Sequence, residues 1–133
     1  MKRVGLFIGV NKYSHGISKL EFAKNDADKL SDCFKGKGYE VERLLNEEVT
    51  YDGILKKIDE IKGGLKSGDL FVLYFAGHGV EIAGRHCLLC ADADDQMDTL
   101  KGKMPLQDLI RYSAKSGIHR LFILDSCRRE LLA

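Results

Sequence analysis

One stretch of the chain decides the fold: residues 69–79 have the sequence DLFVLYFAGHG. Seven apolar or aromatic residues, from Leu70 to Ala76, follow one another without a charge. A run of this length and composition is typical of a strand buried on both faces, as in a parallel sheet. The sequence therefore predicts a central strand over residues 69–76, followed by a turn at Gly77-His78-Gly79.

Similar apolar runs alternate with segments of helical period along the rest of the chain. They predict strands over residues 3–10, 39–45 and 120–125, and helices over residues 25–35, 51–65 and 104–116. Strands that alternate with helices predict an α/β fold, in which a mainly parallel sheet is covered by helices on both faces. Residues 79–91 predict a β-hairpin that leaves the sheet, and residues 92–98 form an acidic loop.

Composition limits the classes of function. A chain of 133 residues with 44% hydrophobic residues fits one compact domain over residues 1–133. Lys and Arg number 21 and Asp and Glu 20, so no strong field favours nucleic acid or an anionic membrane. No apolar stretch approaches the about 20 residues that a membrane helix needs. The four cysteines do not frame short loops, and we expect reduced thiols in a cytoplasmic protein.

Two reactive side chains are predicted at the carboxyl ends of neighbouring strands. His78 follows the strand over residues 69–76, and Cys127 follows the strand over residues 120–125. Because parallel neighbours lie about 4.8 Å apart and end at the same edge of the sheet, a thiol and an imidazole can meet there. Hydrolysis by a cysteine requires a thiolate, a proton donor and backbone N–H groups for the oxyanion, here those of Gly79 and Cys127.

At these residues the chain resembles the caspase superfamily of cysteine peptidases, and within it the paracaspases and metacaspases. Four motifs carry the resemblance: FIGVNKY at residues 7–13, NDA at residues 25–27, YFAGHG at residues 74–79 and LDSCR at residues 124–128. His78 and Cys127 are 49 residues apart, and about 50 residues separate the two in caspases. The resemblance implies a three-layer sandwich and an endopeptidase with a Cys127-His78 dyad.

The resemblance also implies a substrate preference. Caspases proper carry Gln-Ala-Cys at the nucleophile and bind aspartate, whereas here Asp125 stands two residues before Cys127. In paracaspases and metacaspases the matching Asp and a second one at the start of the first helix, here Asp26, line an acidic pocket. Since carboxylates pair well with guanidinium and ammonium groups, we expect cleavage of proteins or peptides after Arg or Lys.

The family implies further parts of the protein. Its larger catalytic portion is followed by a smaller segment that supplies more strands and the rest of the substrate groove. We therefore expect residues 1–133 to be the large-subunit-like portion, with a sheet that is incomplete at its C-terminal side and a small-subunit-like C-terminal segment as partner. No cofactor or metal is expected, although calcium at the acidic loop stays open, as does homodimer formation.

Other interpretations of the same residues stay open. Cys127 alone is also typical of a buried structural thiol, Asp26 of a helix N-cap and Asp125 of a strand end. Cys87 and Cys90 suggest zinc, but residues three apart on a strand point to opposite faces, and no second ligand pair follows.

The alternative function is a catalytically inactive caspase-like interaction or regulatory module. The presence of both His78 and Cys127 argues against it. A receiver-like signalling domain is also disfavoured, because it would need a phospho-acceptor Asp at the end of the third strand, where the chain has Ala76-Gly77-His78.

Overall fold

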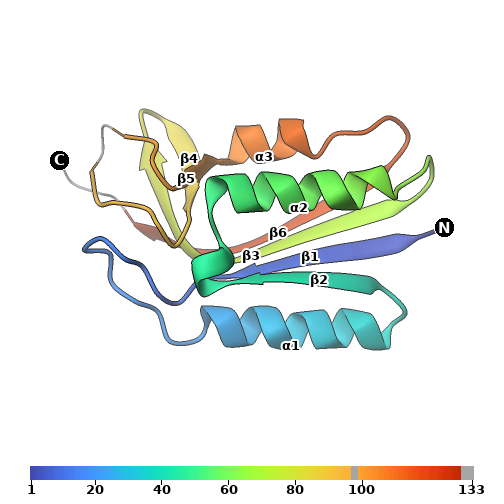
Figure 1. The fold of residues 1–133 in the computed structure, drawn as a ribbon, viewed down its shortest axis with the longest axis horizontal. Coiled ribbons are helices and arrows are strands. Elements are labelled where there is room, and N and C mark those ends of the chain that lie inside the picture. Colours follow the sequence, from blue (N-terminus) through green and yellow to red (C-terminus); the bar gives the residue numbers. More distant parts are fainter. Residues whose placement is uncertain (97–98, 130–133) are drawn as a thin grey trace.

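The structure is a computed structural model of the chain that describes residues 1–96 and 99–129, the last three without their side chains. In chain order its elements are β1 (Arg3–Gly9), α1 (Ala23–Gly36), β2 (Glu40–Leu45), the short 3-10 helix η1 (Asn46–Glu48), α2 (Tyr51–Gly63), β3 (Leu70–Ile82), β4 (Arg85–Leu89), β5 (Lys103–Pro105), α3 (Leu106–Tyr112) and β6 (His119–Arg129). The strands form one sheet, with α1 on one face and α2 and α3 on the other (Figure 1). The α/β three-layer prediction is confirmed.

The parallel part of the sheet has the order β2-β1-β3-β6. After β1 the chain moves through α1 to β2 on one side, and then through α2 to β3 on the other side of β1. The strand order therefore reverses at β1, and ligands of open α/β sheets bind beyond the carboxyl ends of the strands at such a reversal. The segment after β1 and the loop after β4 gather at this edge, at the left of Figure 1.

Side chains that alternate along the strands build a core on each face. Leu6, Ile8, Leu73 and Phe75 belong to the cluster that contains Ile54 and Ile58 of α2. On the other face, Phe7 and Tyr74 pack with Ala23 and Ala27 of α1. The period of two along the strands and the helical spacing of the isoleucines explain why these segments form these elements.

The predicted end of the third strand was wrong. β3 does not stop at Ala76 but continues to Ile82, and its distal half pairs with β4 in an antiparallel hairpin that belongs to the sheet. The hairpin turns at Ala83 and Gly84, both with positive φ, which is the backbone that a two-residue turn between twisted strands requires. His78 therefore lies inside a strand, and not in a turn after it.

Two other predicted elements differ from the structure. The helix predicted over residues 104–116 begins only at Leu106, because residues 103–105 pair with β4 as β5. The strand predicted over residues 120–125 extends to Arg129 and is less buried than expected, with Leu121 49% exposed. In the described part of the chain β6 pairs only with β3, so one edge of β6 is uncovered. No helix among the described residues is long and apolar enough to cross a membrane.

Candidate active site

His78 and Cys127 lie opposite one another on neighbouring strands. In the parallel register of β3 and β6, His78 is the partner of Cys127, so their backbones are about 4.8 Å apart. The predicted neighbourhood of the two residues is thus present, although both lie within strands rather than after them. The side chain of Cys127 lies outside the described part of the structure.

The imidazole of His78 is held by a main-chain carbonyl. Its Nε2 atom is 2.7 Å from the carbonyl oxygen of Ser18. A carbonyl can only accept a hydrogen bond, so Nε2 carries the proton and, in the neutral ring, Nδ1 is the basic nitrogen. The ring is buried and lies 5.0 Å from the ring of Tyr13, tilted by 47°. These contacts fix both the tautomer and the orientation of the ring.

The two glycines beside His78 are required by close packing. A Cβ atom at Gly77 would be 2.8 Å from the hydroxyl of Tyr13, which accepts a hydrogen bond of 2.9 Å from the His78 N–H. A Cβ atom at Gly79 would be 3.1 Å from the Ser126 hydroxyl, next to Cys127. Neither glycine has a positive φ, so the unusual dihedrals expected at this position are absent.

Gly79, the candidate oxyanion donor, is not in an open turn. It is buried within β3 and has register partners on both sides, Leu88 in β4 and Arg128 in β6. Because Gly79 directly follows His78, its N–H nevertheless lies close to the pair formed by His78 and Cys127. The role of Gly79 stays a prediction.

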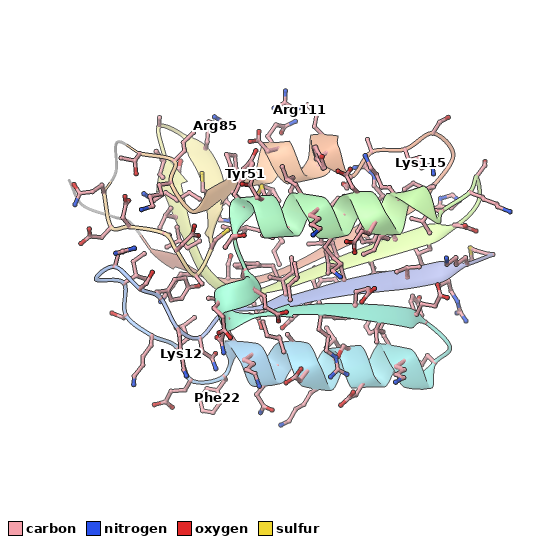
Figure 2. The ribbon with its side chains drawn as sticks, viewed as in Figure 1. Lys12, Phe22, Tyr51, Arg85, Arg111 and Lys115 are labelled. Carbon is pink, nitrogen blue, oxygen red and sulfur yellow. The ribbon has the colours of Figure 1, made fainter. Side chains whose placement is uncertain are left out.

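A pocket of about 230 Å³, which we call the acidic pocket, lies next to His78, between the start of α1 and residues within β3 and β6. It is lined by Leu20, Glu21, Phe22, Ala23, Asp26, Ala76, Gly77 and Asp125. The structure thus brings together the two predicted carboxylates, Asp26 and Asp125, and adds Glu21. Phe22, which is 65% exposed, stands at the start of α1 (Figure 2).

Asp26 is not the N-cap of its helix. The N-cap of α1 is Phe22, and Asp26 lies in the first turn, where its N–H donates to the Phe22 carbonyl. Capping by its side chain therefore does not explain Asp26. Asp125, similarly, does not end a strand, because β6 continues past it.

Tyr74 lies close enough to Asp125 and Asp26 for both carboxylates to affect its pKa. Its hydroxyl donates a hydrogen bond of 3.2 Å to Asp125 Oδ2. Burial, followed by the negative charges of Asp125 and Asp26 and the hydrogen bond to Asp125, raises the pKa of Tyr74 to about 12. The phenol therefore stays protonated at neutral pH and keeps donating to Asp125, which holds that carboxylate in the lining of the pocket.

The sequence profile of the caspase domain matches residues 2–132. The chain belongs to the caspase-domain family. This is a family of cysteine peptidases, as the resemblance at His78 and Cys127 predicted.

A solved structure has the same fold. The caspase domain is similar to protein GSU0716 from Geobacter sulfurreducens, seen in a crystal structure, with a TM-score of 0.81 and 22% sequence identity. The match covers 96% of this chain and 51% of that one, so the caspase domain described here spans about half the length of that protein. Comparison with curated proteins gives no match.

Sequence reasoning missed three contributors to the site of the caspase domain. Ser18 acts through its carbonyl, which any residue could supply, so no side-chain pattern marks it. Glu21 lies outside the motifs. Tyr13 is part of the FIGVNKY motif, and the same motif contains Asn11, whose Oδ1 accepts a hydrogen bond of 2.9 Å from Lys24 N and so holds the first turn of α1.

The cysteines considered for zinc are core residues. Cys87 and Cys90 are fully buried, and burial raises the pKa of both thiols, so neither is a ready thiolate. Within residues 1–96 and 99–129, side chains aside for the last three, no group of three or more His, Cys, Asp or Glu could hold a metal ion.

Proposed function

We propose that this caspase domain is the catalytic part of a cysteine endopeptidase of the paracaspase or metacaspase type, which cleaves proteins or peptides after Arg or Lys. The observation that carries the proposal is the acidic pocket beside the strand pair that bears His78 and Cys127. The substrate specificity and the catalytic chemistry rest on different residues, so an experiment can refute one of them without the other.

The lining of the acidic pocket favours a cationic side chain. Three carboxylates line it, from Glu21, Asp26 and Asp125, and none of its described lining residues is Lys, Arg or His. A guanidinium or ammonium group would pair with these carboxylates, while the methylene stem of the substrate side chain would contact apolar lining such as Leu20 and Ala76. An aspartate side chain would instead meet like charge without a compensating cation.

The orientation of His78 supports its role as acid and base. In the proposed reaction His78 Nδ1 takes the proton of the Cys127 thiol, and the thiolate attacks the carbonyl carbon of the scissile bond. The N–H groups of Gly79 and Cys127 donate to the oxyanion. As the tetrahedral intermediate collapses, the C–N bond breaks and the amine takes a proton from His78 Nδ1. The Ser18 carbonyl, bonded to Nε2, stabilises the imidazolium that carries this proton.

The acyl-enzyme is then hydrolysed at the same groups. His78 Nδ1 takes a proton from water, the hydroxide attacks the thioester carbon, and the C–S bond breaks. The products are the new carboxylic acid and the Cys127 thiolate, with His78 again protonated. The proposed reaction steps need no cofactor.

We further propose a partner segment and a cellular location. The uncovered edge of β6, with Leu121 half exposed, would accept a strand from a small-subunit-like C-terminal segment, and a second copy of the protein is the other candidate for that edge. Cys33, Cys87 and Cys90 are free thiols, which fits a reducing cytoplasm.

The chemistry is tested by incubating the full-length protein with matched fluorogenic peptides that carry Arg, Lys or Asp before the scissile bond. We expect cleavage after Arg and Lys, and its loss in Cys127→Ala. Full activity in Cys127→Ala would contradict the proposed nucleophile. An inactive wild-type protein that still binds such peptides would favour the interaction module.

The specificity is tested by neutralising the pocket. Asp125→Asn should lower kcat/KM for the Arg peptide by about 10- to 100-fold, the effect of one charge-assisted contact. Asp52→Asn is the matched control, because Asp52 is an exposed carboxylate on α2, which covers the opposite face of the sheet from α1. Equal kcat/KM in both variants, or faster cleavage after Asp than after Arg in the wild type, would refute the pocket assignment.

A further inference from the structure

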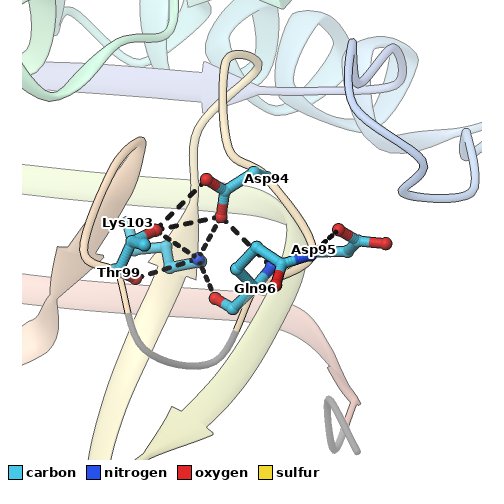
Figure 3. Close-up of polar contacts among 5 residues, drawn as sticks. All are labelled: Asp94, Asp95, Gln96, Thr99 and Lys103. Atoms are coloured by element: carbon cyan, nitrogen blue, oxygen red, sulfur yellow. Dashed lines mark hydrogen bonds and ion pairs between the residues drawn. The ribbon is translucent and has the colours of Figure 1, made fainter. Parts of the chain in front are cut away.

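A fully buried lysine lies at the centre of the acidic loop. Lys103, the first residue of β5, is 0% exposed. Its Nζ atom donates to Asp94 Oδ1 at 2.7 Å, to the Gln96 carbonyl at 2.5 Å and to the Thr99 carbonyl at 2.9 Å (Figure 3). A lysine has three N–H donors, and these three oxygens satisfy them all.

Asp94, Gln96 and Thr99 are arranged around this ammonium group. Removing a charge from water is costly unless it is paired and hydrogen-bonded, and Asp94 supplies the opposite charge. Asp94 in turn accepts from Thr99 Oγ1 and from the Gln96 N–H, and its hydrogen bond with Lys103 is the main cause that lowers the pKa of Asp94. Lys103 thus takes the place that a bound cation has in many acidic loops.

The loop supports the segment that follows β1. The N–H and the hydroxyl of Ser14 both donate to the Ala91 carbonyl, each at 3.1 Å. His15 forms a β-bridge with Asp94 itself. Ile17, further along the same segment, is buried in one cluster with Ala93. Ser14, His15 and Ile17 therefore rest on residues 91–94.

The same segment holds the catalytic imidazole. Tyr13 accepts the hydrogen bond from the His78 N–H, and the Ser18 carbonyl accepts from Nε2. Both contacts come from residues that directly flank the supported stretch. Lys103 is thus bonded to Asp94, Asp94 forms a β-bridge with His15, and the backbone from His15 leads to the Ser18 carbonyl that accepts from His78.

We propose that Lys103 is a positioning residue, whose ammonium group fixes residues 94–96 as the base for residues 13–18 and thereby sets the orientation and tautomer of His78. The role of His78 as acid and base rests on the function proposed above. Its orientation does not, so the two can be tested apart. Contact alone does not establish coupling between distant groups, and the test therefore reads out His78 directly.

The experiment compares Asp94→Asn with Asp95→Asn in the full-length protein labelled with ¹⁵N at histidine. Asp95 is the matched control, because it is the neighbouring carboxylate, it is exposed, and its Oδ1 accepts from Gln96 Nε2 rather than from Lys103. The readouts are the ¹⁵N shifts of the His78 ring, assigned through His78→Gln, and kcat and KM on the Arg peptide. Lys103→Met and Lys103→Arg follow.

In Asp94→Asn and Lys103→Met we expect the two ring nitrogens of His78 to move toward a mixture of tautomers, with kcat lowered about tenfold and KM nearly unchanged. Asp95→Asn should have the His78 shifts and the kcat of the wild type. Lys103→Arg, which keeps the positive charge, should lie between Lys103→Met and the wild type in both readouts. If Lys103→Met does not fold, the His78 shifts of Asp94→Asn still test the proposal. A folded Asp94→Asn with wild-type His78 shifts would overturn the inference, whereas moved shifts in a protein without peptidase activity would support it and refute only the proposed function.

Discussion

The substitution Gly77→Ala tests the packing that holds His78. The added Cβ atom would lie 2.8 Å from the Tyr13 hydroxyl and 2.9 Å from the Phe75 ring. Phe75 is fully buried whereas Tyr13 is only partly buried, so the strain is expected to displace Tyr13. The hydroxyl of Tyr13 is the acceptor for the His78 N–H, and that N–H would lose its bond.

Two costs of similar size follow. Overpacking a close-packed site costs about 1–3 kcal/mol, and a buried N–H without a partner costs about 1–3 kcal/mol. Alanine has less conformational freedom than glycine in the unfolded chain, and this difference stabilises the folded protein by about 0.4–1 kcal/mol. We expect Gly77→Ala to lower the free energy of unfolding by about 2–4 kcal/mol, a large share of the about 5–15 kcal/mol typical of a domain.

The assay is urea unfolding followed by circular dichroism, with Gly63→Ala as control. A Cβ atom at Gly63, the exposed last residue of α2, would meet nothing within 4 Å, so Gly63→Ala should be neutral or stabilising by up to about 1 kcal/mol. A lower free energy of unfolding in Gly77→Ala, together with an unchanged or higher one in Gly63→Ala, would support the reasoning. A loss below about 0.5 kcal/mol in Gly77→Ala with unchanged m-value would refute it.

Three further predictions concern thiols and titration. A thiol reagent should modify exposed Cys33 in the native protein within minutes but buried Cys90 only on unfolding; equal rates would contradict the buried assignment. In a spectroscopic alkaline titration Tyr74 should ionise near pH 12, and Asp125→Asn should lower its pKa, since the carboxylate helps to raise it. Hydrogen bonds from the N–H groups of Lys66 and Lys2 lower the pKa of Asp69, so wild type should be more stable than Asp69→Asn at pH 7. That advantage should vanish as the pH falls below about 4 and the carboxyl of Asp69 is protonated, and a difference independent of pH would exclude this cause.

Local sequence determined most of the sheet and the proximity of His78 and Cys127. Apolar runs of strand length and isoleucines at helical spacing depend on periods that are visible along the chain, so β1, β2 and α2 were predicted within about two residues. The proximity of His78 and Cys127 followed from one rule, that chain-adjacent strands of a parallel sheet are commonly neighbours. The Asp26-Asp125 pair was predicted from the family resemblance, and the structure places both in one pocket.

Only the tertiary structure decided how those residues are held. The continuation of β3 past His78 depends on pairing with β4, and a strand that gains partners on both edges extends beyond its apolar run. The support of His78 comes from the Ser18 carbonyl, which carries no side-chain signature. Lys103 in sequence is one of many lysines, most of which are solvated; it is buried because Asp94 and two carbonyls converge on it, and such convergence exists only once distant segments have been brought together by folding.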